Sequence, residues 1–85
     1  MVDSVIVTVV CRNRNFEADM ELPAALPLYV LKEQLLEVLK RMRPELFFRT
    51  RKIQFVQKGA MISEYHTLAE IGAWDGSFLE IIEEG

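Results

Sequence analysis

The sequence has very little of the residue types from which metal sites and nucleophilic active sites are built. Its 85 residues include one histidine, His66, and one cysteine, Cys11. A structural zinc site takes about four ligands drawn mainly from these two types, and Cys–His catalysis needs an adjacent pair. No phosphate-binding or dinucleotide-binding glycine motif is present. We therefore predict that the protein is not an enzyme and that it binds no metal or cofactor.

The sequence also lacks the residues needed for an internal disulfide and for a transmembrane helix. A single cysteine cannot form an internal disulfide, which fits a reducing cytoplasm. No apolar run approaches the roughly 18 residues of a transmembrane helix, and residues 1–10 lack the basic start and cleavage site of a signal peptide. The chain is nevertheless 51% hydrophobic. We predict one folded domain, residues 1–85, with a modest core.

Positive charge is scarce except in one stretch. The net charge is −3, which argues against a general nucleic-acid binder. Seven of the ten basic residues nevertheless lie between positions 40 and 58, with one acidic residue among them. The simpler interpretation is a solvated, dipolar surface. The alternative is a basic patch for an acidic protein or an anionic membrane, formed by Arg41, Arg43, Arg49, Arg51 and Lys52.

The clearest periodic segment is residues 27–42, which we predict to be a helix. Its apolar residues recur every three or four positions and so form one stripe. Pro27 suits the first helical position, where its missing N–H costs nothing. Pro44 predicts the end of the helix. The stripe consists of Leu28, Leu31, Leu35, Leu39 and Met42.

Two strands are predicted before this helix. Residues 5–11 form an almost unbroken β-branched run, which indicates a central strand covered at least in part on both faces. Cys11 shares the parity of Val5, Val7 and Val9, so a buried thiol is favoured over a reactive one. A polar turn at residues 12–15 leads to residues 16–22. These alternate apolar and acidic side chains, as expected of an edge strand.

The second half of the chain predicts a further sheet region. Residues 45–48 are apolar and should form a loop that either plugs one end of the core or docks a partner. Residues 52–58 and 77–83 are predicted strands, the last at the sheet centre beside the first, and residues 60–62 form a short strand at best. Thr67 and Glu70 match a capping box, which predicts one helical turn at residues 67–71.

The order of these elements resembles ubiquitin over nearly the whole chain. Shared features are Leu22-Pro23 before the helix, the leucine stripe, the Lys-Ile-Gln-Phe-Val run from Lys52 and Leu68 placed before Ile81-Ile82. The resemblance implies an α+β fold of the β-grasp type, in which a mixed sheet of four to five strands packs on one helix.

The sequence is still more similar to the bacterial YukD/EsaB-type ubiquitin-like proteins of type VII (WXG100, Esx) secretion systems. The similar segments are residues 22–28, which lead into the helix, and residues 68–81 with their Ile71-Gly72-Ala73-Trp74 run. This resemblance implies a cytoplasmic, non-enzymatic accessory protein that binds the secretion ATPase or the membrane channel component, and that lies at the inner face of the membrane through those partners. It leaves open a homodimer, and an excised ubiquitin-like domain of the channel component itself.

The end of the chain departs from ubiquitin and from the related sulfur carriers, which end in Gly-Gly. Here the last residues are Glu83-Glu84-Gly85. One glycine after two anionic side chains does not suit the narrow slot of an activating enzyme. We therefore predict neither conjugation nor thiocarboxylate chemistry. Glu83 and Glu84 are expected to be exposed, where no burial would raise a pKa.

The main recognition face of ubiquitin is the outer side of its third and fifth strands, and the resemblance carries this over to two apolar positions. These positions are Val56 and Ile82, with Gln54, Lys58 and Glu80 around them. Chance placement of two aliphatic residues on a sheet is the alternative.

A second candidate surface lies off the leucine stripe of the helix. Tyr29 and Leu36, with Val30, either form an apolar surface or pack at the periphery of the core. Trp74 lies in a predicted turn, where a lid on the core is slightly favoured over an exposed anchor for a partner.

Overall fold

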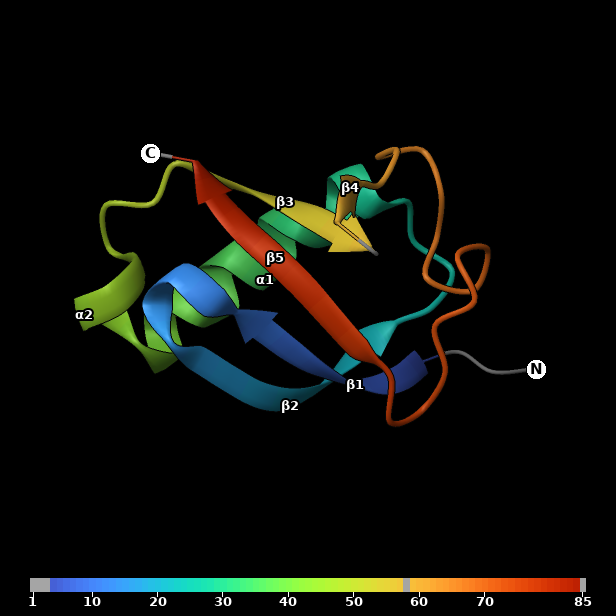
Figure 1. Ribbon diagram of the computed structural model, residues 1–85, viewed down its shortest axis with the longest axis horizontal. Coiled ribbons are helices and arrows are strands. Elements are labelled where there is room, and N and C mark those ends of the chain that lie inside the picture. The colour runs from blue at the N-terminus through green and yellow to red at the C-terminus, as the bar shows by residue number, and fades with distance from the viewer. Residues whose placement is uncertain (1–3, 58, 85) are drawn as a thin grey trace.

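The fold is a five-stranded mixed sheet that packs on one long helix, as the sequence predicts. The computed structural model describes residues 4–57 and 59–84. Figure 1 shows helix α1 lying across one face of the sheet, with strand β5 running through the centre. The elements are β1 (Ser4–Cys11), the 3₁₀ turn η1 (Arg12–Arg14), β2 (Phe16–Pro23), α1 (Leu28–Met42), α2 (Pro44–Phe47), β3 (Lys52–Gln57), β4 (Ala60–Met61) and β5 (Phe78–Glu84).

The strand order is β2-β1-β5-β3-β4. Strands β1 and β5 are parallel, whereas the β1–β2, β3–β5 and β3–β4 pairs are antiparallel. The last strand therefore lies at the centre beside the first, which confirms the prediction. Strand β2 forms one edge, and its alternation of apolar and acidic residues places the acidic side chains outside.

Strand β1 is fully buried on one face and only partly covered on the other, within the partial cover that was predicted. Val5, Val7, Val9 and Cys11 face the core, but Ile6 on the other face is 50% exposed. The helix covers the inner side of the sheet, whereas on the outer side of β1 Thr8 and Val10 are half-buried. The predicted polar turn after β1 is present, and Asn15 at its end takes the left-handed conformation with φ 52°.

Helix α1 buries Leu28, Leu31, Leu35 and Leu39, in agreement with the predicted stripe. Two details were wrong. Pro27 is the N-cap residue in an extended conformation (φ −58°, ψ 146°) rather than the first helical residue. Met42, the last residue of the predicted stripe, is half exposed, whereas Phe47 is buried in the core.

Residues 44–47 form a short helix, α2, where a loop was predicted. Pro44 ends α1 and also starts α2, since proline suits the first position of a helix. Phe47 is fully buried and packs edge-to-face on Phe16, with ring centroids 5.3 Å apart, which confirms the plug at the end of the core. Phe48 is 62% exposed, and the Arg49 guanidinium lies 5.2 Å from its ring centroid.

The predicted capping box is present between β4 and β5. The Thr67 N–H donates to Glu70 Oε1 (2.8 Å), and the Glu70 N–H donates to Thr67 Oγ1 (3.1 Å). One turn closes when the Ile71 N–H donates to the Thr67 carbonyl (3.1 Å), and the following residues continue as turns rather than as a helix. The turn holds Leu68 in the core, fully buried.

Two further expectations concern the C-terminal residues and membrane-spanning helices. Glu83 was predicted to be exposed, but its side chain is largely covered. It pairs with Arg14 and accepts a hydrogen bond from Thr50 Oγ1 (2.6 Å). Gly85, on which the prediction about conjugation rests, lies outside the described residues. Within residues 4–57 and 59–84, no helix has the length and apolar character needed to cross a membrane.

Candidate protein-binding surface

The predicted binding residues lie on the outer face of the sheet, opposite α1. In β5, Leu79 and Ile81 are buried in the core, so Glu80 and Ile82 face outward. The antiparallel register sets Val56 opposite Glu80 and Gln54 opposite Ile82. The structure therefore brings these four residues together on two neighbouring strands. Lys58, the fifth, lies outside the described residues.

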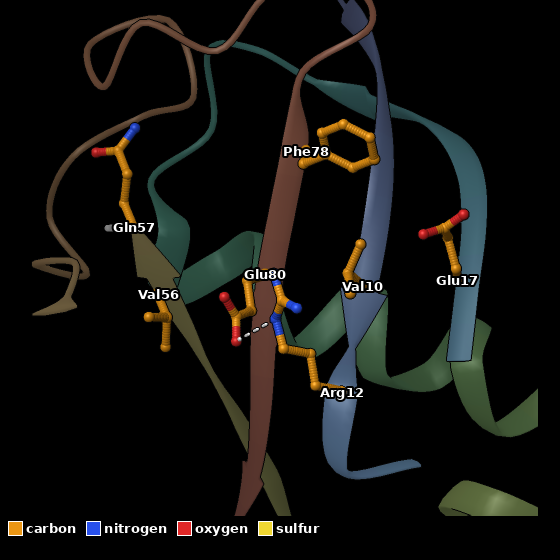
Figure 2. Close-up of a pocket in the computed structure, with 7 residues that line it drawn as sticks. All are labelled: Val10, Arg12, Glu17, Val56, Gln57, Phe78 and Glu80. Atoms are coloured by element: carbon orange, nitrogen blue, oxygen red, sulfur yellow. Dashed lines mark ion pairs between the residues drawn. The ribbon is translucent and has the colours of Figure 1, made fainter. Parts of the chain in front are cut away.

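The outer face contains a shallow hollow of about 400 Å³ between β1, β5 and β3. Figure 2 shows Phe78 at one end, Val10 beside it on β1 and Val56 across β5. The Arg12 Nε atom lies 3.3 Å from Glu80 Oε2, so an ion pair lies between Val56 and Val10. Glu17 on β2 and Gln57 on β3 form the polar borders.

The prediction included Val56 and Glu80 but missed Phe78, Val10 and Arg12. Phe78 is the most exposed apolar side chain of this hollow, at 74%. Its parity was a usable signal, because it shares the face of Glu80 and Ile82 once Leu79 and Ile81 point inward. Val10 was missed for a different reason, because it lies on β1 and the transferred recognition face comprised only the third and fifth strands.

The Arg12–Glu80 ion pair is expected to contribute more to recognition than to stability. The Arg12 side chain is 78% exposed, so solvent screens the pair and its net contribution to folding is small. A charge pair in the middle of an apolar surface does, however, restrict which partners can bind, because a partner must match both charges when it excludes water.

The exposed apolar surface continues toward residues 74–77. The Ile6 N–H donates to Asp75 Oδ1, and the Gly76 N–H donates to the Ile6 carbonyl, each at 2.8 Å. These bonds fix the turn beside the half-exposed Ile6. Trp74 in this turn is 71% exposed, so the prediction of a lid on the core was wrong. Its side chain is available as an anchor, the other interpretation that the sequence allowed.

The second predicted surface does not form as one unit. Leu36 is partly buried and packs against the core, as the peripheral-core interpretation predicted. Tyr29 is partly exposed and contacts Tyr65 edge-to-face, with ring centroids 6.0 Å apart. The two tyrosines make a small aromatic surface where the first turn of α1 meets the loop after β4, and sequence reasoning missed Tyr65.

An ion pair between Lys32 and Glu64 lies beside these tyrosines. The hydrogen bond from the Lys32 ammonium, followed by its charge, lowers the pKa of the Glu64 carboxyl below its ordinary value. A lowered pKa in the folded state stabilises the fold above the unfolded-state pKa. That contribution is lost as the pH falls through the folded-state pKa.

Replacing this lysine, Lys32→Met, is expected to raise the pKa of Glu64 to near its ordinary value of 4.5. The variant should also lose less stability than the wild type on acidification below about pH 4.5, because the stabilising Lys32–Glu64 interaction is already absent. An NMR titration of the Glu64 carboxyl measures the first effect, and urea unfolding at several pH values measures the second. Lys40→Met, which removes the same charge elsewhere on α1, should leave the Glu64 pKa unchanged.

The predicted basic patch is divided by local pairing. Arg43 Nε lies 3.4 Å from Glu45 Oε2, and Lys52 Nζ lies 3.3 Å from Glu84 Oε2. Arg49 stacks on Phe48, whereas Arg41 and Arg51 are exposed. Two of the five basic side chains thus have acidic partners, and the basic patch stays a prediction.

The groups that could perform covalent chemistry are inert or isolated. Cys11 is buried, and burial, together with the nearby Glu83 charge, raises the pKa of its thiol. A neutral, inaccessible thiol is a poor nucleophile. His66 is exposed in a turn. Across residues 4–57 and 59–84, no three Cys, His, Asp or Glu side chains gather closely enough to hold a metal ion.

Comparison with protein families gives one match. The family described as "WXG100 protein secretion system (Wss), protein YukD" matches residues 4–81. A search of curated proteins found no match.

Several solved structures are similar to this chain in fold. The ubiquitin-like domain of the Mycobacterium tuberculosis type VII secretion protein ECCD1 is 21% identical, with 95% of this chain and 99% of that one covered and a TM-score of 0.75. The EccD5 ubiquitin-like domain from Mycobacterium xenopi is 18% identical, with coverage of 95% and 94% and a TM-score of 0.79.

A further similar structure belongs to a much longer chain. It is a component of the MycP5-free ESX-5 inner membrane complex, 24% identical, with a TM-score of 0.78. The match covers 99% of this chain but 22% of that one. This chain therefore spans about a fifth of the length of that component.

Proposed function

We infer the function from the family, because this chain belongs to the YukD proteins of the WXG100 protein secretion system (Wss). We propose that it is a non-enzymatic, ubiquitin-like adaptor of a type VII secretion system. In this proposal it acts in the cytoplasm by binding a protein of the apparatus, either the ATPase or the membrane channel component, and reaches the inner face of the membrane through that partner.

The observation that supports this proposal best is the outer face of the sheet. Phe78, which is exposed, and the half-buried Val10 and Val56 line a hollow on this face. An apolar centre with a polar border is the usual anatomy of a protein-binding surface. The hollow is shallow and lacks a buried titratable pair, so a protein surface suits it better than a small substrate.

A second form of the same function is that of a domain. The similar ESX-5 component carries this fold within a chain several times longer, in an inner membrane complex. The corresponding proposal is that the present chain acts as the ubiquitin-like domain of a membrane channel component. The same outer face would then contact a neighbouring subunit instead of a separate partner.

Site-specific cross-linking tests the proposal in a cell that carries such a secretion system. A photoreactive amino acid at Gln57, on the border of the hollow, is expected to capture the ATPase or the channel component. The same amino acid at Glu33, on the solvent side of α1, should capture neither. If both positions capture only unrelated proteins, or if the chain stays uncomplexed, the secretion assignment is wrong.

A further inference from the structure

The edge strand β2 lies beside a groove that the proposed function does not use. The groove runs between β2 and α1, has a volume of about 330 Å³ and is distinct from the outer sheet face. Met20 and Leu22 line it from the strand. Val38 and Met42, both exposed by more than a third, line it from the helix. Two apolar surfaces thus meet along an open sheet edge.

The backbone of β2 offers unpaired hydrogen-bonding groups along this groove. The Thr8 N–H donates to the Ser77 carbonyl (2.8 Å), and the Ile6 carbonyl accepts from Gly76, so the even residues of β1 pair away from β2. The odd residues of β1 therefore pair with β2, and they lie opposite Leu22, Met20, Ala18 and Phe16.

Because hydrogen bonding alternates along an antiparallel pair, the N–H and C=O groups of the intervening β2 residues point away from β1. These residues are Glu17, Asp19 and Glu21. Within the described chain no other strand pairs with them, since β2 is the sheet edge. Pro23 has no N–H and closes this row at one end.

The side chains of the same three residues form an acidic row on the outer face. Asp19 accepts a hydrogen bond from Thr8 Oγ1 and Glu21 accepts one from Ser4 Oγ, each at 2.7 Å. Among residues 4–57 and 59–84, no lysine or arginine lies within ion-pair distance of Glu17, Asp19 or Glu21. The formal negative charge of the row is therefore not offset by a local ion pair.

This charge decides which occupant fits. A second copy of the chain that paired through β2 would bring two acidic rows side by side, and like charges on neighbouring strands are unfavourable. A strand with basic side chains on that face would be attracted instead. Its alternate side chains would enter the apolar groove, because successive residues of a strand point to opposite faces.

We propose that the β2 edge and the β2–α1 groove bind an extended segment of a partner protein in which aliphatic residues alternate with lysine or arginine. The segment adds a sixth strand to the sheet. Its backbone pairs with Glu17, Asp19 and Glu21, its aliphatic side chains contact Met20, Val38 and Met42, and its basic side chains face the acidic row.

The test uses the whole chain and a synthetic eight-residue peptide in which valine and lysine alternate, acetylated and amidated at its ends. Hydrogen exchange followed by NMR should show new protection of the Glu17, Asp19 and Glu21 amides. The Ala18 and Met20 amides are already bonded to β1 and should change little. Chemical shifts should move at Val38 and Met42. A peptide with glutamate in place of lysine should not bind.

Two charge-reversal variants give a matched comparison. Asp19→Lys should weaken binding of the valine–lysine peptide by at least about tenfold, because it puts a like charge in the middle of the row. Glu33→Lys makes the same change on the solvent side of α1 and should leave the affinity unchanged.

The proposal is overturned if the basic peptide fails to bind at millimolar concentration, if the acidic peptide binds equally well, or if the shifts map to the hollow at Phe78. It is also overturned if the chain dimerises through β2. The peptide measurement needs no secretion component, so its failure leaves the proposed adaptor function unaffected.

Discussion

The Phe47→Ala variant is expected to lose about 3–5 kcal/mol of unfolding free energy. The Phe47 side chain is fully buried, packs on Phe16 and fills the end of the core beneath the last turn of α1. Its removal combines lost apolar burial with a cavity at a place where α2 closes the core. Domains of this size have only about 5–15 kcal/mol of stability, so the variant should approach global unfolding.

Urea unfolding of the wild type and the two neighbouring phenylalanine variants measures this effect. Phe48→Ala makes the same chemical change one residue later, at a side chain that is 62% exposed, and should cost less than about 1 kcal/mol. Equal losses for the two variants would contradict the packing of α2 described above. Wild-type stability for Phe47→Ala would show that the plug is not part of the core.

Phe78→Ala is expected to weaken binding to the captured secretion component by at least about 30-fold, or roughly 2 kcal/mol, with little change in stability. Phe78 is 74% exposed in the free chain and stands at one end of the hollow (Figure 2). An aromatic side chain that is exposed in the free protein and buried in the complex is a typical binding hot spot. Because Phe78 is mostly exposed, it contributes little to the free energy of unfolding, whereas the buried Leu79 and Ile81 contribute more.

The matched control for this prediction is Tyr65→Ala. Tyr65 is an exposed aromatic residue on a different surface, where it contacts Tyr29. This variant should retain wild-type affinity. Affinity measured by titration calorimetry, with melting temperatures determined in parallel, separates binding from folding. If Phe78→Ala binds like the wild type, or if Tyr65→Ala loses as much affinity, the outer sheet face is not the docking surface.

The resemblance to ubiquitin indicated only part of the outer sheet face. Sequence similarity to ubiquitin directed attention to Val56 and Ile82 on the third and fifth strands, and the register confirms that these strands are adjacent. The same similarity gave no reason to include β1, which contributes Val10, or the following turn η1, which contributes Arg12 to the ion pair with Glu80. The surface is thus wider than the transferred positions suggested.

Much of the fold was readable because its signals are local. The leucine spacing of α1, the alternation along β2, the stop at Pro44 and the capping box at Thr67 each involve residues within a few positions of one another. Such patterns depend on backbone geometry, which repeats every 3.6 residues in a helix and every two in a strand. The β-propensity of the last strand placed it at the sheet centre beside the first, and the resemblance to ubiquitin indicated the β-grasp fold.

Exposure of individual side chains was decided only by the tertiary structure. Phe47 is buried and Phe48 is exposed, Trp74 lies outside the core, and Ile6 stays half uncovered within an unbroken apolar strand. Each outcome depends on whether a segment distant in sequence packs against the residue. The groove beside β2 arises in the same way, from a strand and a helix that meet only after folding. Local sequence thus determined which elements form and which faces are apolar, whereas long-range packing determined which of those faces remain open to a partner.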